Sequence, residues 1–243
     1  MSTLEIISMI PLAALLAACA IAFAWKPMKW KFTRIIAWLW RSLMPDWIVQ
    51  RRLLGTLYAM SIRDHALWLI YGDKAAGAEK VPFPAHGHVW DLGCNIGLFS
   101  VAAAQSGCRV TAFDISETNV LCVRQTAWLN HFNICAVNCP VTTSPCQWER
   151  TENGHTENAM TRKGKLVSLT YEQAAQIYGM PDFIKFDIQG GEREFLMGAF
   201  KDWVMQHGIA IYLETHGDCA EWVWPEMTRI GPIHYWLPNP STP

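Results

Sequence analysis

Charged residues are scarce in this chain of 243 residues. Asp, Glu, Lys and Arg make up 17% of it and hydrophobic residues 51%, a composition that excludes an intrinsically disordered protein. The formal net charge is −1, but residues 26–64 hold eight basic and two acidic side chains. A short basic stretch that follows an uncharged one is typical of a membrane anchor rather than of a nucleic-acid-binding protein. We therefore expect no nucleic acid as a partner.

Recognisable cysteine motifs are also missing. The chain has eight cysteines, but none of them form a C-x-x-C pair. Cys135, Cys139 and Cys146 are close in sequence, yet their spacing matches no common zinc site. The part of the chain after residue 45 is long enough to bury a full core without disulfides. We expect buried, reduced thiols and no metal ion.

The N-terminal residues contain an uncharged run, Ile6 to Trp25. A helix of that length spans about 30 Å, the thickness of the hydrocarbon core of a bilayer. No Lys or Arg precedes the run, whereas residues 26–45 are basic and rich in tryptophan. By the positive-inside rule, we predict a single-pass transmembrane anchor at 1–25, an interfacial segment at 26–45 that contacts membrane lipid, and a cytoplasmic domain after it.

Three alternatives to the anchor stay open. A cleaved signal peptide would have a basic start, which this sequence lacks. Residues Leu16 to Cys19 resemble a bacterial lipoprotein box, which would send the domain out of the cytoplasm. The third alternative is a helix that is buried in the protein.

Residues 46–87 read as a helical lead-in to the main domain. Leu53, Leu54 and Leu57 stand at helical spacing within residues 47–71, so we predict a helix there. Residues 74–87 contain two prolines and two glycines and should form the loop that follows.

A strand, a glycine-rich turn, a helix and a second strand open the main domain, residues 88–243. The first strand covers residues 88–92, the helix starts at Leu98, and the second strand ends in Asp114. This order is half of an α/β nucleotide-binding sheet. A carboxylate at the end of the second strand can accept hydrogen bonds from both hydroxyls of a ribose.

The turn lacks the G-x-G-x-x-G spacing of a dinucleotide site, which argues against a nicotinamide-dependent reductase. An acidic residue just before the turn suits a ligand with an ammonium group. S-adenosylmethionine has an ammonium group, a ribose and no phosphate. The glycines would let the backbone approach such a ligand. The candidate cofactor-binding residues are Asp91, Gly93, Asn95, Gly97 and Asp114.

Polar side chains also end two later strands, which we predict at residues 181–188 and 209–216. In an open α/β sheet, ligands bind beyond the carboxyl ends of the strands. Asp187, Glu214 and His216 fall at such ends and are the candidate catalytic residues. Glu192, near the start of the helix after the first of these strands, reads as a structural charge at a helix N-terminus.

Together these segments resemble the FkbM family of S-adenosylmethionine-dependent methyltransferases. The resemblance covers residues 89–217 and is carried by VWDLGCNIGLFS (89–100), RVTAFD (109–114), DFIKFDIQGGEREFLMGA (182–199) and IYLETHG (211–217). It implies a Rossmann-like class I methyltransferase sheet with helices on both faces, preceded here by the predicted transmembrane helix. It also implies S-adenosyl-L-methionine as cofactor and methyl transfer to a hydroxyl oxygen. The acceptor would be a sugar, a lipid-linked glycan or a secondary metabolite.

An alcohol is a weak nucleophile at neutral pH, so a nearby base would assist the transfer. Asp187, Glu214 and His216 all stay open for this role, and histidine is the residue type that titrates nearest neutral pH. The alternative is a catalytically silent, membrane-anchored protein that uses the fold as an interaction module. Gln189 and Thr170, which stand where the family usually has acidic residues, support that alternative.

The other segments give coarser expectations. A third strand should lie within residues 130–141, and residues 144–165 should form an exposed loop or hairpin. After the fifth strand we predict a helix at residues 222–229 and an edge strand at residues 233–237.

Overall fold

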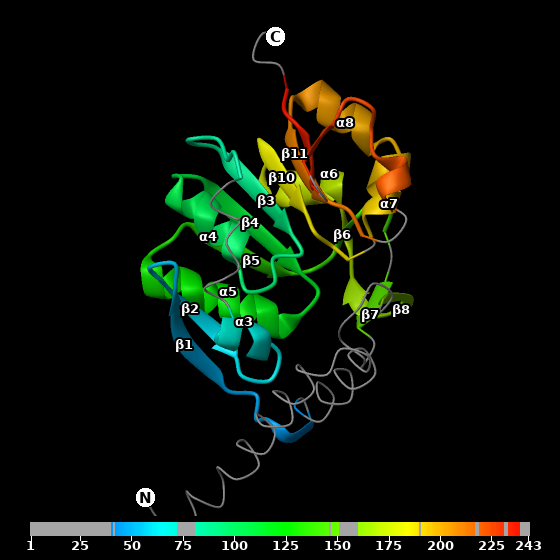
Figure 1. Cartoon of the computed structure of the whole chain (residues 1–243). Helices are drawn as coiled ribbons and strands as arrows, with labels where there is room; N and C mark the ends of the chain where they lie inside the picture. Colours follow the sequence, from blue (N-terminus) through cyan, green and yellow to red (C-terminus); the bar gives the residue numbers. More distant parts are fainter. Residues whose placement is uncertain are drawn as a thin grey trace, which may run out of the picture.

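The computed structural model describes residues 40, 42–71, 81–145, 147–150, 160–189, 191–216, 219–230 and 233–238. Its centre is a seven-stranded sheet with helices on both faces (Figure 1). In spatial order the strands are β12 (Thr228–Ile230), β13 (Ile233–Trp236), β11 (Ala210–Glu214), β10 (Phe183–Phe186), β3 (His88–Leu92), β4 (Arg109–Asp114) and β5 (Ile134–Asn138).

Five neighbouring strands of this sheet are parallel. From β5 through β4, β3, β10 and β11 they follow the order 3-2-1-4-5 of a doubly wound α/β fold. The order reverses between β3 and β10, and the crevice at such a reversal is where ligands bind in these folds. The predicted α/β class is therefore confirmed, as is a third strand within residues 130–141.

Two apolar clusters attach the helices to opposite faces of the sheet. On one face, Trp90 and Ile184 pack with residues of α6, α7 and α8. On the other face, Val89 and Val110 pack with residues of α4 and α5. The helices are α4 (Leu98–Gln105), α5 (Glu117–Asn130), α6 (Tyr171–Tyr178), α7 (Glu192–Met197) and α8 (Phe200–His207).

The predicted helix over residues 47–71 is wrong. The segment forms two antiparallel strands, β1 (Ile48–Leu53) and β2 (Thr56–Ser61), followed by the short helix α3 (Ala66–Tyr71). Leu54 and Gly55 both have positive φ, 48° and 85°, as the tight turn of a hairpin requires. The leucine spacing that suggests a helix runs across the turn: Leu53 ends β1, Leu54 lies in the turn and Leu57 belongs to β2.

This hairpin packs on the main domain beside α5 (Figure 1). The backbone N–H of Ala59 donates to Thr126 Oγ1 at 2.9 Å. The side chain of Asn130 donates to the carbonyl of Leu57 at 2.7 Å. The hairpin is therefore joined to α5 by direct hydrogen bonds.

The predicted helix at residues 222–229 is also wrong. A short 3-10 helix, Cys219–Trp222, ends before Pro225, and the chain then enters β12. Proline disfavours a helical conformation in the residue before it, here Trp224, whose side chain is buried in the core. The last strand, β13, is not at the edge: it pairs antiparallel with both β11 and β12.

For residues 144–165 the sequence predicts either an exposed loop or a hairpin, and the structure has a hairpin. β7 (Gln147–Arg150) pairs antiparallel with β8 (Met160–Val167), apart from the central sheet (Figure 1). A third small pair joins β6 (Val141–Thr142) to β9 (Leu169–Thr170) in parallel. Thr170 also caps α6: its side chain accepts from the backbone N–H of Gln173 at 3.2 Å.

Within the described residues, no helix is long and apolar enough to cross a membrane. The predicted anchor at 1–25 and all but a few residues of the interfacial segment at 26–45 lie outside the described residues. Both stay predictions.

Candidate functional site

The turn between β3 and α4 needs left-handed backbone at three positions. Gly93, Asn95 and Gly97 have φ of 76°, 50° and 85°. A Cβ on Gly93 would overlap the carbonyl oxygen of Asp187, and one on Gly97 would lie 3.0 Å from Val123 Cγ2. Backbone conformation and close packing therefore require these two glycines. Whether the turn also lets a ligand approach stays a prediction.

The predicted ribose acceptor, Asp114, ends β4 beside this turn and is 8% exposed. Its Oδ2 accepts from the backbone N–H of Asn95 at 2.9 Å and from Asn119 Nδ2 at 3.0 Å. Its Oδ1 accepts from the backbone N–H of Ser116 at 2.8 Å. Burial raises the pKa of Asp114, although these hydrogen bonds act in the opposite direction. The structure therefore places Asp114 and Asn95 together, as the sequence predicts.

The structure gives Asp91 a partner that the sequence analysis does not foresee. Asp91 is fully buried, and Lys185 Nζ lies 3.0 Å from its Oδ1 in an ion pair. Ser100 Oγ donates to its Oδ2 at 2.6 Å. Because the carboxylate has no exposed surface in this structure, a ligand's ammonium group cannot contact it directly. In this structure the acid at this position pairs with the lysine on the neighbouring strand, where Lys185 and Asp91 are register partners.

Lys185 links the turn to a second cluster of predicted residues, which consists of Asp187, Glu214 and His216. It is 1% exposed, and its Nζ donates to the carbonyl of Gly93 at 2.8 Å and lies 3.9 Å from Asp187 Oδ2. Burial acts to lower the pKa of Lys185, but the carboxylates of Asp91 and Asp187 outweigh it and the net shift is upward. A lysine between Ile184 and Phe186 in an otherwise apolar strand is the signal that could have revealed this residue.

The three predicted catalytic residues lie close together. His216 Nε2 is 3.7 Å from Asp187 Oδ1 and 4.0 Å from Glu214 Oε1. Gln189 joins them, because its Nε2 donates to Asp187 Oδ1 at 2.9 Å and lies 3.1 Å from His216 Nε2. Burial, with a contribution from Asp187, raises the pKa of Glu214.

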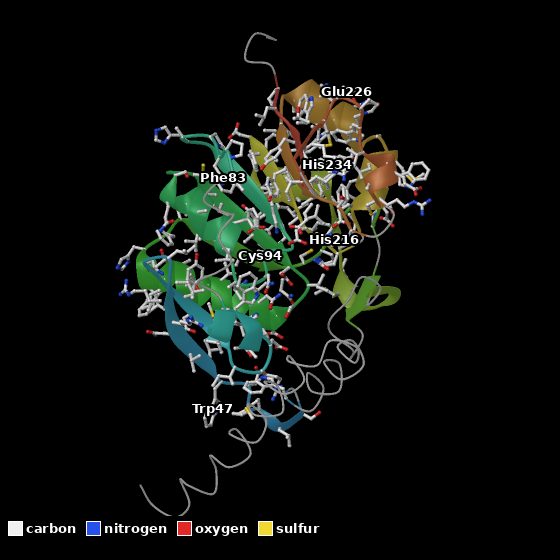
Figure 2. All side chains as sticks on the ribbon, viewed as in Figure 1. Trp47, Phe83, Cys94, His216, Glu226 and His234 are labelled. Atoms are coloured by element: carbon white, nitrogen blue, oxygen red, sulfur yellow. The ribbon has the colours of Figure 1, made fainter. Side chains whose placement is uncertain are left out.

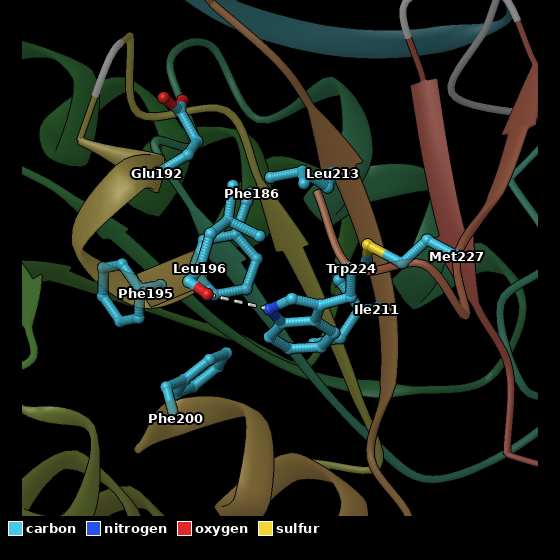
Figure 3. Close-up of a pocket in the computed structure, with 9 residues that line it drawn as sticks. All are labelled: Phe186, Glu192, Phe195, Leu196, Phe200, Ile211, Leu213, Trp224 and Met227. Atoms are coloured by element: carbon cyan, nitrogen blue, oxygen red, sulfur yellow. Dashed lines mark hydrogen bonds between the residues drawn. The ribbon is translucent and has the colours of Figure 1, made fainter. Parts of the chain in front are cut away.

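Glu192 holds the opposite side of the histidine ring. Its Oε1 accepts from the backbone N–H of Ile188 at 2.9 Å and lies 3.3 Å from His216 Nδ1. The side chain is fully buried. Figure 3 shows it at the edge of a small cavity lined by aromatic rings, with its carboxylate directed away from those rings. Glu192 begins α7, as the sequence predicts, and the contact with His216 is an addition; that its role is structural stays a prediction.

The contacts at His216 define where its proton lies. An amide NH₂ group can only donate, and Gln189 must turn this group toward the carboxylate of Asp187. His216 Nε2 is then an acceptor, and Nδ1 carries the proton that faces Glu192. Figure 2 shows Cys94, in the turn between β3 and α4, and His216, in the cluster with Asp187 and Glu214, near the middle of the molecule. Lys185 lies between the turn and this cluster, because it contacts Gly93 and Asp91 on one side and Asp187 on the other.

Comparisons with known proteins give a likeness of fold only. No protein-family model and no curated protein matches the sequence. The matching solved structures include the tRNA (uracil-54, C5)-methyltransferase of Pyrococcus abyssi in complex with S-adenosyl-L-homocysteine, at 12% identity and a TM-score of 0.36. They also include TYW2 of M. jannaschii in complex with AdoMet, at 10% identity and a TM-score of 0.40. A third is the C-terminal domain of the precorrin-6Y C5,15-methyltransferase from Rhodobacter capsulatus, at 13% identity and a TM-score of 0.34.

The match to the tRNA (uracil-54, C5)-methyltransferase covers 68% of this chain and 34% of that one. The match to TYW2 covers 71% of this chain and 64% of that one. The match to the precorrin-6Y methyltransferase domain covers 54% of this chain and 55% of that one. This chain therefore spans less than two thirds of each of them. A likeness at this level establishes no family, and the resemblance to FkbM methyltransferases stays a prediction.

Proposed function

We propose that this protein is an S-adenosylmethionine-dependent methyltransferase of the FkbM type that transfers a methyl group to a hydroxyl oxygen. The proposal rests on the order of motifs in the sequence and on one observation in the structure. Lys185 contacts both Asp91, which precedes the glycine-rich turn, and Asp187, which belongs to the second cluster. A cofactor site and an acceptor site that share a wall are what a direct methyl transfer needs.

Of the predicted cofactor-binding residues, Asp114 fits S-adenosylmethionine as a direct ligand and Asp91 does not. Asp114 Oδ1 accepts one hydrogen bond, from Ser116, and a carboxylate oxygen can accept a second. Asp114 would therefore hold a ribose hydroxyl, beside the backbone of Asn95. Asp91 would act through Lys185 on the shape of the turn and not as a direct ligand. When bound, S-adenosylmethionine supplies a methyl group on a positively charged sulfur.

We assign the base to His216. Its unprotonated Nε2 would take the proton of the acceptor hydroxyl as the oxygen forms its bond to the methyl carbon and the carbon–sulfur bond breaks. Glu192, which faces Nδ1 at 3.3 Å, would orient the ring and stabilise the positive charge that it gains. Asp187 and Glu214 would then accept hydrogen bonds from the acceptor's other hydroxyls.

The charge of the second cluster favours neutral, hydroxyl-rich acceptors. Asp187 and Glu214 are both acidic, so an anionic group beside the reacting oxygen would be repelled. A sugar, a lipid-linked glycan or a polyhydroxylated secondary metabolite fits this requirement. The silent-module alternative is favoured by one observation: Asp114 Oδ2 already accepts from three groups of the protein, the backbone N–H of Asn95, Asn119 Nδ2 and, at 4.0 Å, the Cys94 thiol.

Calorimetric titration with S-adenosylhomocysteine separates the two functions. An enzyme should bind it, and Asp114→Ala should weaken the affinity by about 1.5–3 kcal/mol, a factor of about 10 to 150, because hydrogen bonds to a charged acceptor are lost. Asp202→Ala, an exposed change on α8, is the control and should bind as the wild type does. No binding by the wild-type chain would support the silent module, and unchanged affinity in Asp114→Ala would refute the ribose assignment.

We further propose that residues 1–25 anchor the protein in a membrane with the domain in the cytoplasm. The uncharged run from Ile6 to Trp25 and the basic residues after it support this topology. A protease applied to intact spheroplasts should leave residues 45–243 uncut. A mature chain that begins at a lipid-modified Cys19 would reverse the topology and contradict the proposal.

A further inference from the structure

A continuous chain of side-chain hydrogen bonds runs from the hairpin to the predicted ribose acceptor. It begins at Ser61, the last residue of β2, and passes through His65 and Asn119 to Asp114. The backbone N–H of Ser61 lies 3.0 Å from His65 Nδ1. His65 Nε2 lies 2.9 Å from Asn119 Oδ1, and Asn119 Nδ2 lies 3.0 Å from Asp114 Oδ2.

The first contact fixes the direction of every hydrogen bond that follows. A backbone N–H can only donate, so His65 Nδ1 must be unprotonated. The Cys122 thiol, 3.9 Å from the same nitrogen, can also only be a weak donor to it. The neutral ring then carries its proton on Nε2 and donates to Asn119 Oδ1.

This donation leaves the NH₂ group of Asn119 facing Asp114. Without a donor at position 65, Asn119 Oδ1 would lose its hydrogen bond, and only the carboxylate itself would still oppose a turn of the amide that presents its oxygen to Asp114. That orientation would be repulsive, because both groups accept hydrogen bonds. His65 is 2% exposed and Asp114 8% exposed, so water is poorly placed to replace the lost contacts.

We propose that His65 is a positioning residue for cofactor binding, which acts through Asn119 to hold the carboxylate of Asp114 in place. This inference rests on the proposed role of Asp114. It gives the hairpin β1–β2 a part in the cofactor site, although neither strand lies in the central sheet. The chain of hydrogen bonds extends beyond Ser61 to Asp46, because Ser61 Oγ donates to Asp46 Oδ1 at 3.3 Å.

The test compares substitutions at position 65 in the full chain. His65→Phe keeps a ring and removes both nitrogens, and the affinity for S-adenosylhomocysteine should fall about fivefold to tenfold, the equivalent of one hydrogen bond. His65→Gln can place an amide NH₂ near the position of Nε2, so it should restore most of the affinity. His88→Phe is the matched control: His88 is 4% exposed, starts β3 at the opposite end of the strand from the turn, and hydrogen-bonds to Thr111.

A merely structural histidine would behave differently in a double-mutant cycle. If His65 acts through Asn119, adding His65→Phe to Asn119→Ala should cause no further loss of affinity. Losses that add, or an affinity in His65→Phe that matches the wild type, would overturn the proposal.

A second measurement keeps the inference testable if the wild-type chain binds no cofactor, which would refute the proposed function. Carbon NMR of the Asp114 carboxyl group gives its pKa without a ligand. His65→Phe should raise that pKa and His88→Phe should not, because only the first removes an oriented donor to the charged form. An unchanged pKa in His65→Phe would overturn the role of His65 independently of cofactor binding.

Discussion

The buried ion pair between Lys185 and Asp91 allows a quantitative prediction. Lys185→Met keeps most of the side-chain volume but leaves the carboxylate of Asp91, which is fully buried, without its counter-ion. Breaking a buried pair by removing one partner costs about 3–5 kcal/mol. The carbonyl of Gly93 also loses its donor at 2.8 Å. We therefore expect a loss in the upper part of that range.

Urea denaturation followed by tryptophan fluorescence measures this loss, because Trp90 is buried on β3 next to Asp91. For a domain of this size, about 2–4 °C of melting temperature corresponds to 1 kcal/mol. With the upper part of that range taken as about 4–5 kcal/mol, Lys185→Met should lower the melting temperature in a thermal scan by about 8–20 °C. Lys201→Met is the control: Lys201 pairs with Glu226 at 2.7 Å on the surface, and its loss should leave the midpoint nearly unchanged.

The double variant Asp91→Asn/Lys185→Met decides whether the charge is the cause. An asparagine leaves no buried charge and can still accept from Ser100, so the double variant should be more stable than Lys185→Met alone. A cost below about 1 kcal/mol for Lys185→Met, or a double variant as unstable as the sum of the singles, would refute the reasoning.

Two further predictions concern the same edge of the sheet. The pKa of Glu214 is raised in the folded state, which means that its charged form destabilises the fold. Glu214→Gln should therefore be more stable than the wild type above that raised pKa. This gain in stability should vanish below the ordinary pKa of 4.5, where the carboxyl group is neutral in both the folded and the unfolded state. Melting temperatures between pH 4 and 8 check this, and a gain that is independent of pH would contradict it. Gly93→Ala should cost about 1–3 kcal/mol for its backbone conformation alone and more for the overlap with Asp187. Gly208→Ala, which also has a positive φ but open space around its Cβ position, should cost less in the same denaturation assay.

The strand-turn-helix-strand unit could be predicted because its signals are local. Short apolar runs, glycines at the turn and an acid at the end of each strand specify residues 88–114 without knowledge of the rest of the fold. The helix predicted over the hairpin at residues 48–61 is wrong because Leu53, Leu54 and Leu57 stand at helical spacing only across the turn between β1 and β2. The Leu54–Gly55 turn, between segments that contain β-branched residues, was the better signal.

The missed parts of the candidate site depend on contacts between residues far apart in sequence. Asp91 and Lys185 are neighbours because β10 lies beside β3, and no local pattern gives that strand order. The same holds for His65 and Asn119, which meet only when the hairpin packs on α5. The grouping of Asp187, Glu214 and His216 was predictable, since strand ends share one edge of the sheet. Their roles in catalysis stay predictions.

The position of β13 has a consequence for synthesis of the protein. β12 follows β11 in the chain, but its place in the sheet lies beyond β13, which is made later. Until β13 leaves the ribosome, the outer edge of β11 has no partner within the described sheet, and an open strand edge can pair with other chains. A chain that stopped after Ile230 would contain every candidate site residue and still expose that edge. We expect such a truncated product to aggregate rather than to accumulate as a folded protein.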